Sequence, residues 1–183
     1  DLPDGPFAAG SGILSVGRLI RDKGMDTVIA ASNGLGVPVT IAGEGPERAA
    51  LETQARAHRP GVQFEGFASR ERLGQLYREA GCVVLAARRG EGLPNVLLEA
   101  MAASRAVIAT PCAGTRDLLV DGVNGLLVPP DDVTALRDAF GRLRSDPMLA
   151  TRLGEEARRT AERFGWARVR PLLEEVLERV VRP

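Results

Sequence analysis

Short apolar runs alternate with amphipathic stretches along most of the chain. The apolar runs are rich in Val, Ile and Leu and are bounded by glycine or proline, which predicts strands. These runs cover residues 12–17, 37–42, 62–65, 82–87, 106–110 and 125–130. The segments between them carry apolar residues at helical spacing, which predicts helices. These segments are a stretch beginning at Met25 and residues 46–57, 69–80, 94–103 and 115–120.

A regular alternation of strands and helices predicts an α/β fold. Parallel strands need a crossover between them, usually a helix, so we expect a Rossmann-like, three-layer parallel sheet flanked by helices. Ligands of such sheets bind at the carboxyl ends of the strands. The loops that follow the strands are therefore the place to look for a site.

The last third of the chain contains helical patterns only. One helix is expected at 132–144, and a second is opened by Asp146 as cap and Pro147 in the first turn. A third is expected at 165–181, with an apolar stripe that needs a surface to cover. The stripe consists of Trp166, Val169, Leu172, Leu173, Val176 and Val180.

Residues 90–103 predict a tight loop that opens into a helix, because Pro94 suits a first helical turn. A helix N-terminus has unpaired amides and the positive end of the helix dipole, which favours an anion, above all a phosphate. Asn95 and Glu99 lie four residues apart on one face of this otherwise apolar helix. If buried, Glu99 would need a polar ligand or a neighbouring cation, and a structural ion pair is the simpler alternative.

Composition narrows the classes of function. The chain has 183 residues and 44% apolar content, enough for one full core. Its 24 basic and 24 acidic side chains cancel, so a nucleic-acid partner is not expected. Cys82 and Cys112 end apolar runs and are read as buried free thiols, which favours a reducing compartment and a cytoplasmic location. No apolar run approaches the roughly 20 residues of a membrane span. The first residues do not resemble a signal peptide and read like a cut linker.

Several kinds of chemistry are disfavoured. His58 is the only histidine, read as a solvated surface residue, so a His-rich metal site is excluded. No Asp-x-Asp pair occurs, so neither a metal nor another cofactor is indicated. Gly43 and Gly45 are followed by Arg48 where a dinucleotide fingerprint has its third glycine, and no P-loop is present.

The remaining signal is a set of loops that should meet at one sheet edge, where glycines permit close approach and Arg18 and Lys23 bring two cations. Five motifs occur in order in these loops and beyond them. They are Gly17-Arg-Leu with Lys23-Gly24, Gly43-Glu-Gly-Pro, Phe64-x-Gly66-Phe67, Glu91-x7-Glu99 and Asp121-Gly-Val-Asn-Gly-Leu-Leu-Val-Pro-Pro. Together they resemble the C-terminal, donor-binding domain of a retaining glycosyltransferase of family 4, which has the GT-B fold. The resemblance covers nearly the whole chain.

The resemblance implies roles for individual residues. Arg18 and Lys23 would bind the donor diphosphate, Glu99 the ribose hydroxyls and Glu91 the donor sugar, while the loop around Phe67 borders the base. The residues implied in catalysis are Glu91, Arg18 and Lys23. Those implied in donor binding are Gly17, Arg18, Lys23, Gly43, Phe67, Gly92, Leu93, Pro94, Asn95 and Glu99. Cations and helix amides would take the place of a metal ion, so metal-independent transfer is implied.

The resemblance also implies a division of the chain and a set of partners. Residues 1–11 would be an interdomain linker remnant, 12–163 the nucleotide-sugar-binding domain, and 164–183 a helix that returns to a missing N-terminal domain. That domain would hold the acceptor, which could be a sugar, a lipid or a small molecule, and peripheral membrane association of the full-length protein is compatible with it. The alternative from another class is a non-catalytic nucleotide-binding or interaction module on the same fold. A sugar-nucleotide epimerase would need catalytic groups that the sequence does not supply. The base, the sugar and the acceptor stay open.

Overall fold

The structure, a computed structural model, describes residues 12–58, 61–89, 92–165, 168–171 and 174. It confirms the expected fold class. Six parallel strands form one sheet in the order β3-β2-β1-β4-β5-β6. The strands are β1 Gly12–Val16, β2 Val39–Ala42, β3 Val62–Gly66, β4 Ala80–Leu85, β5 Ala106–Ala109 and β6 Leu126–Leu127.

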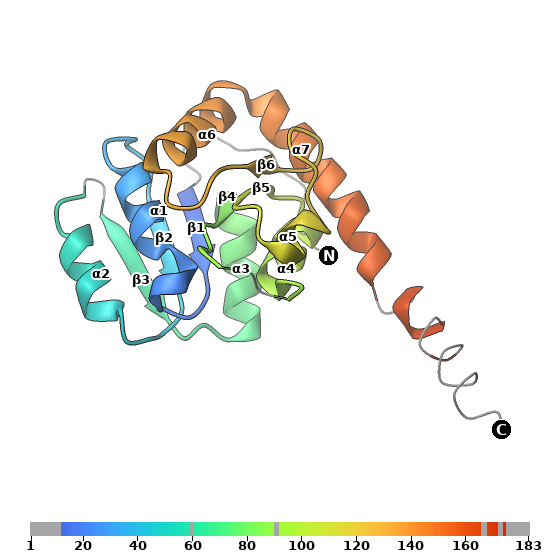
Figure 1. The fold of residues 1–183 in the computed structure, drawn as a ribbon, viewed down its shortest axis with the longest axis horizontal. Helices are drawn as coiled ribbons and strands as arrows, with labels where there is room; N and C mark the ends of the chain where they lie inside the picture. Colours follow the sequence, from blue (N-terminus) through green and yellow to red (C-terminus); the bar gives the residue numbers. More distant parts are fainter. Residues whose placement is uncertain (1–11, 59–60, 90–91, 166–167, 172–173, 175–183) are drawn as a thin grey trace.

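Helices cover both faces of this sheet (Figure 1). The α-helices are α1 Met25–Ser32, α2 Arg48–Ala55, α3 Arg70–Glu79, α4 Asn95–Ala102, α5 Ala113–Arg116, α6 Val133–Ser145 and α7 Pro147–Ala161. Two 3-10 helices, η1 Arg21–Lys23 and η2 Glu162–Phe164, complete the described elements.

The core consists of two apolar layers, one on each side of the sheet. Side chains of β1 alternate between them, because successive residues of a strand point to opposite faces. Ile13 joins α1, α2 and α6 in one layer, and Leu14 joins α3 and α4 in the other. Helix α7 packs beside β5 and contributes Leu153 to the first layer and Ala157 to the second. The two faces are therefore buried and the carboxyl ends of the strands are left for a site.

Most helix starts agree with their sequence signals. The side chains of Ser69, Asp132 and Asp146 each accept a hydrogen bond from a backbone amide three residues on, and Pro147 occupies the first turn of α7. Pro94 differs slightly, since it precedes α4 with extended backbone rather than lying inside the first turn. The expected helix at 115–120 is instead the single turn α5.

The expected final helix at 165–181 is described only in part. Residues 168–171 and 174 are helical and exposed or half-buried. Trp166, Leu172, Leu173, Val176 and Val180 lie outside the described residues, so the proposed stripe stays a prediction. The same is true of the division of the chain at residues 11 and 163.

Candidate functional site

The strand order reverses direction beside β1. From β1 the chain builds outward through β2 to β3, and then returns to place β4 on the other side of β1. The loops after β1 and β4 therefore diverge at their carboxyl ends, which is the usual ligand crevice of an open α/β sheet. Both loops carry predicted site residues.

Backbone hydrogen bonds join the loops that follow the first three strands. The amide of Gly17 donates to the carbonyl of Ala42 at 3.0 Å, and that of Gly43 donates to Gly66 at 2.7 Å. A pocket of about 290 Å³ lies between these loops and is lined by Gly17, Arg18, Gly43 and Phe67, among others. Phe67 is 88% exposed, so its ring is available to a ligand at the rim. The structure thus brings four of the predicted residues together.

Arg18 and Lys23 both lie on the loop after β1. Arg18 is exposed and lines the pocket, while Lys23 is half-buried in η1. Partial burial lowers the pKa of Lys23 from its ordinary value, and the positive charge of Arg18 lowers it further. The second effect requires the two cations to be near each other. An arrangement of this kind favours a ligand with more than one negative charge.

The loop before α4 leads to the helix end that was predicted to bind an anion. Gly92 and Leu93 are exposed, and α4 begins directly after the buried Pro94. A Cβ placed on Gly114 would lie 2.2 Å from the carbonyl oxygen of Gly92, so the turn at α5 packs tightly on this loop. Asn95 is exposed in the first turn. Glu91 lies outside the described residues, and its role stays a prediction.

Glu99 lines a second pocket of about 220 Å³, and Leu73 lines both this pocket and the first. Its carboxylate is exposed rather than buried, and its described partner is the phenol of Tyr77 rather than a cation. The Tyr77 hydroxyl donates to Oε2 of Glu99 at 2.8 Å. Of the partners expected from sequence, a cation in an ion pair is replaced by this neutral donor, and a polar ligand stays a prediction.

Arg88, which the sequence did not single out, joins the two loops of the site. Its guanidinium donates to both carboxylate oxygens of Asp26, at 2.9 and 2.7 Å, and to Oδ1 of Asp131 at 2.5 Å. Its backbone amide donates to the carbonyl of Asp22 at 2.8 Å. Partial burial pushes the pKa of Asp26 up, but the hydrogen bonds and charge of Arg88 outweigh it and the pKa is lowered. Two features of the sequence could have indicated this pair. Arg88 directly follows the predicted strand at 82–87, and Asp26 lies in the first turn of a helix.

Three other sequence expectations concern His58 and the cysteines. The expectation that His58 is solvated is wrong, since it is buried with Nε2 2.5 Å from the carbonyl oxygen of Ile29. A helix end can be covered by the neighbouring helix, and α1 supplies that carbonyl here. Cys82 is a buried free thiol whose pKa burial raises to about 12. Cys112 is also free but only half-buried, because it lies past the end of β5 in the loop.

The described residues hold no cluster of three His, Cys, Asp or Glu side chains that could bind a metal ion. Within the same residues, no helix is long and apolar enough to cross a membrane. Metal independence and location stay predictions.

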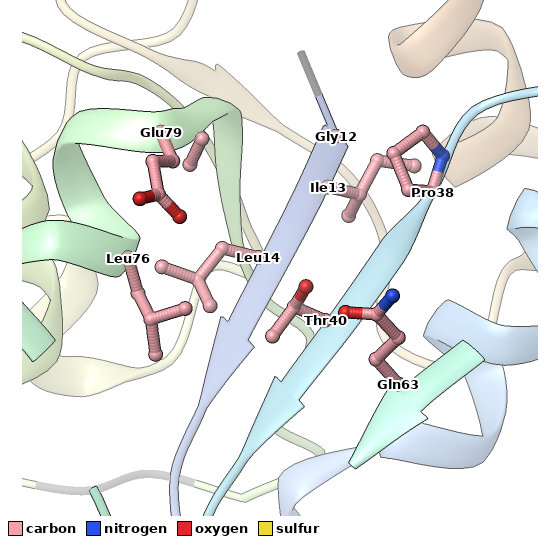
Figure 2. Close-up of a pocket in the computed structure, with 9 residues that line it drawn as sticks. Gly12, Ile13, Leu14, Pro38, Thr40, Gln63, Leu76 and Glu79 are labelled. Carbon is pink, nitrogen blue, oxygen red and sulfur yellow. The ribbon is translucent and has the colours of Figure 1, made fainter. Parts of the chain in front are cut away.

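A different pocket, of about 270 Å³, opens at the amino ends of the strands (Figure 2). Leu14, Thr40 and Gln63 form a row in register across β1, β2 and β3, and Leu76 and Glu79 of α3 face them. None of the predicted site residues lines this pocket. It lies at the wrong end of the sheet for a ligand of the carboxyl-end loops.

Comparison with known proteins identifies a family. The profile of the family described as "Glycosyl transferases group 1" matches residues 10–160. The alpha-D-kanosaminyltransferase of Streptomyces kanamyceticus is 36% identical over 152 residues, which are 79% of this chain and 39% of that protein. The chain thus spans about two fifths of the length of this protein, and the same share of the D-inositol 3-phosphate glycosyltransferase of Xylanimonas cellulosilytica.

Solved structures share the fold. A sucrose-phosphate synthase from Thermosynechococcus elongatus superposes with a TM-score of 0.85 at 28% identity, over 93% of this chain and 45% of that one. The Anabaena protein HepE in complex with UDP gives a TM-score of 0.84 at 22% identity, over 92% of this chain and 49% of that one. The sheet described above is Rossmann-like, as in these GT-B glycosyltransferases.

Proposed function

The chain belongs to the glycosyl transferases group 1 family, and we propose that it binds the nucleoside-diphosphate part of a sugar donor for a retaining transfer of family 4 type. The proposal is supported by two neighbouring cations on the loop after β1 and by a carboxylate-bearing helix that begins after the loop following β4. Arg18 and Lys23 supply the cations, and α4 supplies both its N-terminus and Glu99.

The parts of the donor match the parts of the site. The diphosphate lies against Arg18, Lys23 and the amides that follow Gly92, because these groups together offset its negative charge. The ribose lies in the pocket at Glu99, whose carboxylate accepts hydrogen bonds from the hydroxyl groups. The base reaches the pocket beside Phe67. Leu73 lines both pockets, so the proposed ribose and base sites share this side chain.

The same groups would act on the leaving group during transfer. When the bond to the sugar breaks, negative charge develops on the diphosphate oxygens, and Arg18, Lys23 and the helix amides stabilise it without a metal ion. Glu91 is proposed to hold the donor sugar. The acceptor and further catalytic groups are assigned to a second domain, in line with the chain matching about two fifths of its relatives. Residues 12–163 would then be the donor-binding domain, and 1–11 and 164–183 its connections.

A related protein supports a first candidate for the donor. HepE was solved with UDP and with UDP-glucose, so a uridine donor is the first candidate, with GDP and ADP donors as alternatives. The product would be a glycan or a glycosylated small molecule. A non-catalytic nucleotide-binding module would bind the same ligands and transfer nothing in the presence of the second domain.

Lys23 allows a direct test, because it is the only lysine in the chain. An amine-reactive reagent should label it, with the α-amino group at the start of the polypeptide as internal reference. We expect UDP, GDP or ADP to slow labelling of Lys23 and to leave the α-amino group unaffected, as measured by peptide mass spectrometry. An unchanged labelling rate of Lys23 at millimolar concentrations of all three would refute the proposal.

A further inference from the structure

Tyr77 is the only tyrosine of the chain and lies in α3, which packs on the opposite side of the sheet from α1. It is 4% exposed, and its ring belongs to the apolar layer beneath α3 and α4. Its hydroxyl is the donor to Glu99 described above. A buried phenol thus contacts the carboxylate assigned to the ribose.

The direction of this hydrogen bond is fixed by chemistry. Burial, the charge of Glu99 and the hydrogen bond itself all raise the pKa of Tyr77 above its ordinary value of 10.0. The phenol therefore stays protonated at neutral pH and can only donate to the carboxylate. A carboxylate has about four acceptor positions. The bond from Tyr77 uses one of them on Oε2, so the group can still accept two hydroxyl groups of a ligand.

An exposed glutamate without a fixed partner is not held in one conformation before a ligand binds. Its three side-chain torsions give it many rotamers, and fixing them on binding costs free energy. Tyr77 is held by packing within the layer and so offers a fixed donor at 2.8 Å. The carboxylate is then oriented before the ligand arrives.

We propose that Tyr77 is a positioning residue that orients Glu99 and thereby sets the preference of this site for a ribose with free hydroxyl groups. The inference rests on the proposed function, since it needs a nucleoside diphosphate in the crevice. It goes further by assigning recognition of the sugar hydroxyls to a pair of residues, one of which does not touch the ligand.

A simpler reading is that Glu99 serves Tyr77, by satisfying the hydroxyl of a buried ring. Both readings predict some loss of stability when the hydroxyl is removed. They differ in the ligands that are affected, because only a positioning role depends on the hydroxyl groups of the ribose.

The experiment compares Tyr77→Phe with the wild type by calorimetry. The ligands are the tightest binder among UDP, GDP and ADP, and its 2′,3′-dideoxy form. We expect Tyr77→Phe to weaken the ribose ligand roughly three- to tenfold and the dideoxy ligand less than about twofold. In a Glu99→Ala background, Tyr77→Phe should leave the ratio of the two affinities unchanged, because the hydroxyl then has no carboxylate to orient.

Leu76→Val is the matched control for packing. Leu76 lies beside Tyr77 in α3 and is equally buried, but it has no polar group to offer Glu99. This variant should lower the unfolding midpoint and keep the ratio of affinities.

Three outcomes would overturn the inference. They are an equal loss of both ligands in Tyr77→Phe, no loss of either, and the same change of ratio in Leu76→Val. If the wild type bound none of the three diphosphates, the proposed function itself would fail. The three outcomes above all require a wild type that binds, so the two failures are distinguishable.

Discussion

Replacing Gly24 by alanine should separate the two loops that form the crevice. Gly24 joins η1 to α1, immediately after Lys23, and has φ +65°. A Cβ at this position would lie 2.0 Å from the carbonyl oxygen of Ala86, at the end of the central strand β4. Real Cβ atoms essentially never come closer than 3.0 Å to such an atom. One backbone must therefore move by about 1 Å, and the Lys23 loop moves away from the loop before α4.

The cost has two parts. An alanine in the left-handed region costs about 1 kcal/mol relative to glycine. Forcing an extra methyl group against packed backbone costs about 1–3 kcal/mol more. We therefore expect Gly24→Ala to lower the free energy of unfolding by about 2–4 kcal/mol.

Gly34→Ala is the matched control, because Gly34 has φ +77° but nothing within 4 Å of its would-be Cβ. It should lose only the conformational part, about 1 kcal/mol. Urea unfolding followed by circular dichroism measures both variants. A difference between them below about 0.5 kcal/mol would mean that the close approach of Gly24 to β4 does not hold the loops together.

Two further predictions concern Asp26 and metal ions. The pKa of Asp26 is lowered in the folded chain, so its bonds to Arg88 stabilise the fold above the ordinary value of 3.8 and are lost as pH falls through the lowered value. Asp26→Asn should remove roughly 1 kcal/mol at neutral pH, kept small because Asp26 is nearly half exposed, and should flatten this acid dependence. Asp22→Asn is the control, because its carboxylate lies 4.0 Å from the exposed Arg89. Stability is measured for both variants in acid titrations, and equal pH profiles would disprove the role of Arg88. EDTA should leave nucleoside-diphosphate binding unchanged, since cations and helix amides bind the phosphates, and loss of binding that Mg²⁺ restores would contradict this.

The fold could be predicted from sequence because its signals are local. Glycine or proline lies beside several of the strands, and Ser69, Asp132 and Asp146 cap helices with their own side chains. The last strand, predicted at 125–130, is shorter in the structure, and the sequence itself contains the reason. Pro129 and Pro130 have no N–H to donate to a neighbouring strand, and β6 ends at Leu127.

The parts of the site that were missed depend on contacts between distant positions. Arg88 contacts Asp26 across 62 positions of sequence, and Tyr77 contacts Glu99 across 22. Neither separation matches the period of a helix or a strand, so the local pattern of the sequence does not predict these contacts. His58 was misread for the same reason, since its partner Ile29 lies 29 residues earlier. Tyr77 could have been suspected, because a tyrosine on an apolar helix face needs a partner for its hydroxyl.

Calorimetry of the 183-residue chain with UDP, GDP and ADP tests directly whether Arg18, Lys23 and α4 bind a nucleoside diphosphate. Lys23→Ala should weaken the tightest of these ligands at least about tenfold, because a half-buried cation next to the diphosphate is lost. Arg21→Ala removes a cation two residues away that lines a different pocket with Glu47 and Gln54, and it should change the affinity less than about twofold. We expect measurable heat for at least one diphosphate and this contrast between the two variants. No binding by the wild type, or equal effects of Lys23→Ala and Arg21→Ala, would contradict it.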